Sequence, residues 1–422
     1  MGGRVGGGAY DIMQKLLFSL RTLFVVCLLA TTTTTVLAVN GTESVKAHYL
    51  PEETAARFGE LNILHNNRIC QMQTYAIYFT KKLYGKDTYQ GLTAEQVLTG
   101  WIFWGEEWMD EPMLKMKDGE MKQRMMLRNY VSANTFFKRD NSIYTIDKYV
   151  KAYNKGNKDE FHKQVMSVDN KIQLLMNLRR GLSLKIFPYS IKDSTIWYAP
   201  TEDLPKAMDF KHQEFIQTVF TQLFDNAETN NYKQMDQIVD KMLKYQRVNG
   251  GTSLPSAKQI HAERTCNNIP FATIIFIVCI TMGVPTLLYT ISRLSRQYWL
   301  KKNHDVRAGR KSRIDTAITL ASRLVMLIAF ATISYYLYLL KTINGSLPMA
   351  NKYDIMLLSA WIIMLLSLVV GLKYRILLPI GFIVSAVQMY NALVMWRIIL
   401  HHLRDLETIS RLISIKMPNF AL

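Results

Sequence analysis

The chain has 422 residues, and its 51 Lys and Arg outnumber its 33 Asp and Glu, which gives a formal net charge of +18. Much of this basic excess flanks long apolar stretches, where it orients membrane helices, so we exclude nucleic acid as a partner. The four cysteines form no Cys-x-x-Cys and no Cys-x-x-Cys-His. The chain is therefore neither a thioredoxin-like oxidoreductase nor itself a c-type cytochrome.

Residues 1–38 have the composition of a targeting segment. Basic residues precede a short apolar run at 22–30, and small residues at positions 36 and 38 match a signal-peptidase site. We favour a cleaved signal peptide over a retained N-terminal anchor, because the apolar run is short for a membrane span. Both alternatives leave the chain that follows outside the cytoplasm.

Residues 39–257 predict an exported domain that is mainly helical with minor β content. Apolar periodicity over 53–84 predicts one long helix, which Gly85 ends. Thr93 and Gln96 have capping-box spacing and begin a second helix. Further helices are expected at 143–153, 163–184 and 210–245, and short β-prone segments at 184–189 and 195–199.

A linker at 258–269 leads into a predicted four-span membrane domain at 270–400. Its four apolar stretches approach or exceed the roughly 20 residues that cross a bilayer, and they lie at 270–291, 316–340, 353–372 and 376–400. The loop at 293–313 carries eight Lys and Arg against one acid, Asp305. Short loops rich in Lys and Arg stay in the cytoplasm, so the exported domain and the segment 401–422 are expected on the outer face.

A tryptophan-rich segment at 101–110 is the most conspicuous candidate site of the exported domain. Trp101, Trp104 and Trp108 could stack on a flat ligand. Aromatic residues at helical spacing more often pack a core, and we favour that interpretation for Trp101 and Trp104. The sequence has no nucleophile elbow, no phosphate-binding glycine loop and no His-Glu-x-x-His motif, so no catalytic residue is assigned.

His65, Arg68 and Cys70 lie close together on the first expected helix and could form a ligand site. No second cluster with metal-ligand spacing accompanies them, so we favour a structural role and assign no metal site. Cys70 and Cys266 are the cysteines of the exported domain, and an oxidising compartment would allow them to pair.

Three ionisable residues of the membrane domain are further candidates. Arg323 lies inside its span, where it could serve a function or snorkel to the near surface, and both interpretations stay open. His401 and His402 stand at the outer end of the last span as candidate haem-iron ligands, with interfacial anchoring as the alternative. Adjacent helical residues point about 100° apart, so at most one of the two would serve a given site.

Several strings of the sequence resemble the fused cytochrome c assembly proteins of Bacteroidota, which are of the system II class. They are GELNILHNNRICQMQT at 59–74, FTKKLYG at 79–85 and LTAEQVLTGW at 92–101. SLPS at 253–256, followed by Ala262 and Glu263 just ahead of a span, is also similar. The resemblance covers the chain from about residue 50 to its last residue.

The outer loop between the second and third spans also resembles this family, whose pattern there is G-x-x-P-x-x-N-x-Y-E. The matching residues are Gly345, Pro348, Asn351 and Tyr353, and Asp354 stands where the family has Glu. The family's tryptophan-rich loop, W-G-x-x-W-x-W-D, does not occur in the sequence, so the C-terminal haem-handling part is expected to be missing.

The resemblance implies a multi-pass protein of the cytoplasmic membrane with a large periplasmic domain. It implies a role in haem delivery to periplasmic apocytochrome c and in covalent attachment there, with haem as cofactor and without an independent catalytic constellation. The implied partners are apocytochrome c, the remaining membrane half of the assembly complex and the lipid bilayer. The alternative is a membrane-anchored periplasmic binding or sensory module without haem chemistry.

Overall fold

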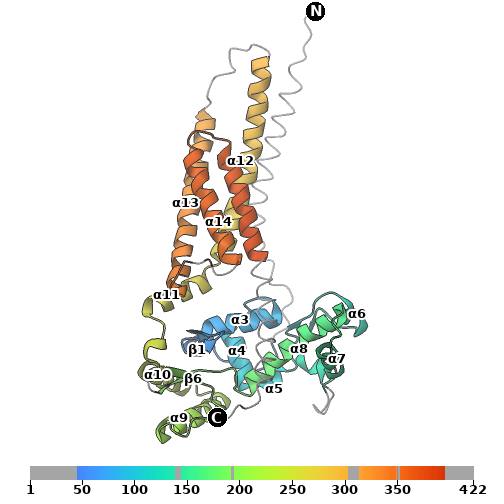
Figure 1. The fold of residues 1–422 in the computed structure, drawn as a ribbon, viewed down its shortest axis with the longest axis vertical. Helices are drawn as coiled ribbons and strands as arrows, with labels where there is room; N and C mark the ends of the chain where they lie inside the picture. The colour runs from blue at the N-terminus through green and yellow to red at the C-terminus, as the bar shows by residue number, and fades with distance from the viewer. Residues whose placement is uncertain are drawn as a thin grey trace, which may run out of the picture. The chain divides into compact units, whose positions relative to one another are not determined.

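The computed structural model describes residues 45–137, 144–191, 194–302, 313–347, 349 and 352–394. It divides into an N-terminal domain, built mainly from Ser44–Ile269, and a span unit, built mainly from Pro270–Tyr338 and Pro348–Met395. Helices dominate both units, and the sheets are small (Figure 1). The predicted fold class is confirmed. The expected targeting segment at 1–38 lies outside the described residues.

The N-terminal domain opens with a helix, a β-hairpin and a second helix. These elements are α2 (Glu52–Phe58), β1 (Asn62–His65), β2 (Arg68–Gln71) and α3 (Met72–Tyr84). The prediction of one helix over 53–84 was therefore wrong. Asn66 and Asn67 form the turn of the hairpin with φ of 49° and 58°, a left-handed conformation that asparagine tolerates and that reverses the chain. Gly85, with φ of 89°, ends α3 as expected.

The rest of the domain is helical, with two further two-stranded sheets. Its elements are α4 (Ala94–Phe103), α5 (Gly105–Trp108), β3 (Leu114–Lys115), α6 (Glu120–Arg124), β4 (Tyr130–Val131), η1 (Ala133–Phe136), α7 (Asp147–Asn154), α8 (Glu160–Arg179), β5 (Phe187–Ile191), β6 (Ser194–Tyr198), α9 (Phe210–Glu228), α10 (Tyr232–Asn249), η2 (Gly251–Ser253) and α11 (Ala257–Asn268).

Several local predictions for this part of the chain are confirmed. The capping box of Thr93 and Gln96 begins α4, and the two β-prone segments pair as β5 and β6. One prediction was wrong, because the helix expected over 210–245 breaks into α9 and α10 at Asn230, whose φ is 55°. Most of the expected linker at 258–269 is helical, as α11.

One buried glutamine of α10 joins two segments that lie far apart in the sequence. Gln246 is only 1% exposed. Its side-chain oxygen accepts from the Asn62 N–H at 2.9 Å, and its side-chain nitrogen donates to the Asn62 carbonyl at 2.8 Å. The same nitrogen donates to the Ile186 carbonyl at 2.7 Å, just before β5. Gln246 therefore fixes the start of β1 beside the chain that enters β5.

The span unit contains α12 (Phe271–Lys302), α13 (Arg313–Asn344), α14 (Lys352–Val370) and a fourth helix at Leu377–Val394 (Figure 1). Each has a stretch long and apolar enough to cross a membrane, with mean hydropathy between 1.7 and 2.3. These helices confirm the four predicted spans and indicate a multi-pass membrane protein.

Glycines let the fourth helix pack closely against two of the others. A Cβ atom added to Gly283 of α12 would lie 3.0 Å from Phe382, and one added to Gly381 would lie 2.0 Å from the Ser367 hydroxyl of α14. Small residues at such contacts allow the close approach that stabilises helices in lipid.

Replacing Gln246 by leucine should destabilise the N-terminal domain. Gln246→Leu leaves the Asn62 N–H and the carbonyls of Asn62 and Ile186 buried without these bonds, and each such group costs about 1–3 kcal/mol. We expect the free energy of unfolding to fall by about 3 kcal/mol, measured by denaturant unfolding of the full chain. Gln217→Leu, at an exposed position of α9, is the matched control. Equal stability of the two variants would contradict the prediction.

Candidate functional site

A cavity of about 490 Å³ lies beside the β1–β2 hairpin. Its lining comes from the hairpin, from α3 and α8, and from the loop at 182–185. His65 lies on the hairpin side, with its ring centroid 5.0 Å from that of Tyr75 and 4.6 Å from that of Tyr78. Of the residues that the sequence singled out in this domain, His65 is therefore the one that contributes to a concave site.

Most other side chains that carry the chemistry of this cavity are amides or charged groups. They are Asp169, Asn170, Gln173 and Asn177 of α8, Lys82 of α3 and Lys185 of the loop. Asp169 is 5% exposed and accepts from the Tyr144 hydroxyl at 2.8 Å. Burial, and then the Asp169 charge, raise the pKa of Tyr144, so its phenol stays protonated. The cavity thus offers amides and charges of both signs, in contrast to an apolar slot.

Sequence reasoning missed the α8 part of this lining. Asn170, Gln173 and Asn177 follow the helical spacing i, i+3, i+7, which places them on one face of α8. Their spacing was a usable signal, but nothing local in the sequence indicates that this face meets a hairpin about a hundred residues earlier.

Arg68 has a structural role, as favoured from the sequence. Its guanidinium donates to the Glu263 carboxylate of α11 at 3.1 Å, and the Thr74 hydroxyl donates to the same oxygen at 2.6 Å. Glu263 is only 4% exposed, and a buried carboxylate of this kind needs both an opposite charge and hydrogen bonds. The three residues grouped in the sequence spread along the hairpin instead of gathering on one helix.

Cys70 of β2 and Cys266 of α11 are separate thiols, so the pairing considered from the sequence is not formed in this structure. Burial, followed by the Glu263 charge, raises the pKa of Cys70 to about 12 and that of Cys266 to about 11. Both thiols stay protonated near neutral pH, where they are poor nucleophiles and poor metal ligands. Within the described ranges, no three His, Cys, Asp or Glu side chains come together to hold a metal ion.

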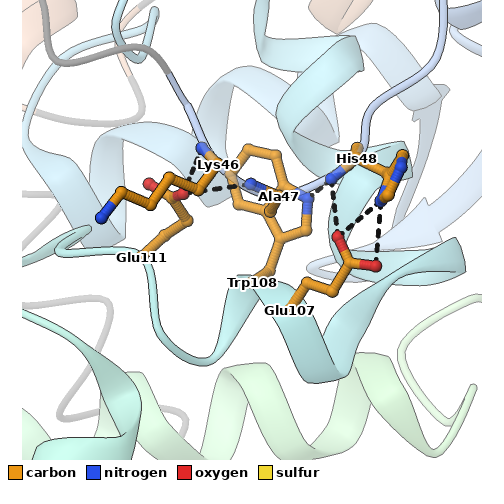
Figure 2. A network of polar contacts seen from close by, with 6 residues as sticks. All are labelled: Lys46, Ala47, His48, Glu107, Trp108 and Glu111. Carbon is orange, nitrogen blue, oxygen red and sulfur yellow. Dashed lines mark hydrogen bonds and ion pairs between the residues drawn. The ribbon is translucent and has the colours of Figure 1, made fainter.

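The tryptophan-rich segment packs the core and holds the start of the domain. Trp101 and Trp108 are 1% and 0% exposed, with ring centroids 6.1 Å apart, so the packing interpretation is confirmed for Trp101. Figure 2 shows the backbone at His48 lying against α5, where the Trp108 indole donates to the His48 carbonyl at 2.8 Å. Glu107 accepts from the His48 N–H at 2.8 Å. Glu111 accepts from the Lys46 N–H at 2.8 Å and from the Ala47 N–H at 3.2 Å.

In the span unit, Arg323 caps the C-terminal end of α14. Its guanidinium donates to the Gly371 carbonyl at 3.0 Å and to the Leu372 carbonyl at 3.3 Å. The last carbonyls of a helix lack intrahelical partners and carry partial negative charge, which a cation stabilises. Of the two interpretations left open by the sequence, the geometry therefore favours a structural role for Arg323.

The described residues of the outer-loop motif brace two helices. Gly345, with φ of 73°, ends α13 by donating to the Lys341 carbonyl at 2.9 Å. The hydroxyls of Tyr353 on α14 and Tyr336 on α13 lie 2.8 Å apart. Asp354 is 4% exposed in the first turn of α14, where a carboxylate interacts favourably with the helix dipole. The other motif residues and candidate ligands, Pro348, Asn351, His401 and His402, lie outside the described residues.

Comparison with known proteins gives one distant likeness. No protein-family model matches the chain. The chain is similar to Protein NrfI of Wolinella succinogenes, with 21% identity over 316 residues. The likeness covers 74% of this chain and 33% of that protein, so the chain spans about a third of its relative's length.

Proposed function

We propose that this chain is a membrane-bound cytochrome c assembly factor that takes part in haem delivery to apocytochrome c and in covalent attachment there. The observation that carries the proposal is the likeness to Protein NrfI, which supports a cytochrome c biogenesis family. A match of 316 residues is longer than all of the chain before Pro270, so it includes part of the N-terminal domain and part of the span unit. The motif strings at 59–74, 79–85 and 92–101 support the same class.

Haem is flat and apolar, with two propionates and an iron that needs an axial ligand. The cavity beside His65 does not fit it, because a porphyrin would remove water from amide groups without replacing their hydrogen bonds. In the span unit, Phe271 and Tyr336 stack on each other with ring centroids 5.0 Å apart, and Phe271 is buried, so this pair packs α12 against α13. No histidine occurs among the described residues of the span unit, so His401 and His402 remain the proposed iron ligands of this chain.

The proposed orientation has the N-terminal domain in the periplasm and the basic loop at 293–313 in the cytoplasm. It is supported by the charge bias of that loop, which favours the cytoplasmic side. Because the loop follows the first of the four spans, the chain ahead of that span lies on the other side of the membrane. Apocytochrome c, the remaining membrane half of the assembly complex and the lipid bilayer are the proposed partners. The outer-loop motif of Gly345, Tyr353 and Asp354 would then face the compartment in which haem is attached.

Deleting the gene should lower the covalent haem on c-type cytochromes of its host. Haem-dependent peroxidase staining of denaturing gels measures this quantity, and immunoblotting of the apocytochrome controls for its supply. Expression of the wild-type chain should restore the signal. Unchanged staining in the deletion strain would reject the proposal and favour the membrane-anchored binding or sensory module, which the likeness to Protein NrfI does not favour.

The same strain tests the proposed iron ligands. His401→Ala/His402→Ala removes both candidate imidazoles, so the Soret absorbance per chain that co-purifies with the co-expressed membrane half should fall. His261→Ala, at an exposed position of α11, is the matched control and should keep the absorbance. An unchanged Soret band in the double variant would leave the pair as interfacial anchors.

Reporter fusions test the orientation. A reporter fused after Arg307 should be active only in its cytoplasmic form, and one fused after Asn249 only in its periplasmic form, because the eight basic residues of the first loop hold it inside. Reversed activity at either position would overturn the proposed sidedness.

A further inference from the structure

The α8 wall of the cavity is a row of three amide side chains. The side chains of Asn170, Gln173 and Asn177 all line the cavity from one helical face. Within the part of the chain that the structure describes, none of these three side chains makes a hydrogen bond, and each carboxamide carries both donors and acceptors. Such groups match a ligand that alternates N–H and C=O along its length.

The opposite wall is the outer edge of the hairpin. The Leu64 N–H of β1 points away from β2 and donates to the Lys185 carbonyl at 2.9 Å. In an antiparallel strand, the N–H and C=O of one residue point to the same side, so the Leu64 carbonyl also faces away from β2. Leu64, Asn66 and Lys185 all line the cavity. Because the Leu64 N–H is bonded to Lys185 and the Asn62 main chain is bonded to Gln246, the Leu64 carbonyl is the group of this edge that can accept from the main chain of a ligand.

The chemistry of the lining excludes other simple ligands. Lys82 and Lys185 would attract an anion, but Asp169 brings an opposing charge to the same cavity. A flat apolar ligand would take water from the three amides without replacing its hydrogen bonds, which is unfavourable. A polypeptide main chain would instead satisfy the amides, and its side chains could lie against Met166 and Leu174.

We propose that this cavity binds an extended polypeptide segment through its main chain. The identity of this segment rests on the proposed function: it is part of an apocytochrome c, held near its haem attachment motif while that motif is still unfolded. Recognition through the main chain accepts many sequences, since every residue except proline carries the same N–H and C=O groups.

Peptide binding to the purified full chain in detergent tests this proposal directly. The probe is a fluorescein-labelled peptide with an Ala-x-x-Ala-His core, so that thiol chemistry plays no part, and fluorescence anisotropy gives its Kd. Gln173→Leu/Asn177→Leu should weaken binding about thirtyfold, because it removes two hydrogen-bonding side chains worth about 1 kcal/mol each. Gln217→Leu on α9 is the matched control and should bind like the wild type.

Two further peptides separate main-chain from side-chain recognition. A scrambled peptide should bind within about threefold of the probe, because a Kd difference that small is under about 1 kcal/mol. A peptide with N-methyl groups at alternate residues loses main-chain donors and should bind about tenfold more weakly. This comparison needs no variant, so it stands even where the double variant fails to fold.

Three outcomes would overturn the inference: no binding of any peptide to the wild-type chain, equal affinity of the double variant, or equal affinity of the N-methylated peptide. A fourth outcome, haem binding that Gln173→Leu/Asn177→Leu weakens, would overturn it in favour of a flat ligand. The deletion experiment is independent of these results. Peptide binding together with unchanged covalent haem in the deletion strain would reject the assembly function and keep the peptide site. Lowered covalent haem without peptide binding would keep the assembly function and reject the peptide site.

Discussion

The candidate cavity depends on one buried glutamine. Gln246 of α10 bonds to the main chain of Asn62 and of Ile186, and these two contacts hold β1 beside the chain that leads into β5. Leu64 and Lys185 line the cavity. Leu64 lies two residues after Asn62 and Lys185 lies next to Ile186, so the bonds of Gln246 also position these two lining residues. Because a buried main-chain group without a partner costs about 1–3 kcal/mol, an apolar residue at this position would loosen both segments together.

The other side of the hairpin is held by an ion pair whose carboxylate is buried and whose guanidinium is exposed. Glu263 of α11 accepts from Arg68 and from Thr74, so the hairpin is fixed by α10 at its start and by α11 along β2. Charge in a buried site is retained only where its partners are complete, and here a guanidinium and a hydroxyl satisfy the same carboxylate. The hairpin is therefore a rigid support for His65 and for the Leu64 carbonyl, which line the cavity that we propose as a peptide-binding site.

The sequence predicts the parts of this fold that local patterns control. Continuous hydropathy identified the four spans, and the Thr93 capping box marked the start of α4. The hairpin was missed because apolar periodicity on both sides of Asn66 and Asn67 suggested one helix, although an asparagine pair is a turn signal. The cavity could not be predicted, because it brings the hairpin against α8, and that contact depends on buried tertiary bonds such as those of Gln246.

Site-specific crosslinking in cells tests the central claim most directly, namely that the amide-lined cavity holds an unfolded cytochrome segment. A benzoylphenylalanine residue placed at Gln173 should, on irradiation, give an adduct with an apocytochrome c that lacks haem. Mass spectrometry would identify the partner by its Cys-x-x-Cys-His peptide, and the same probe at Gln217 should give no such adduct. Equal adduct yield at both positions, or no apocytochrome adduct at Gln173, would contradict the claim.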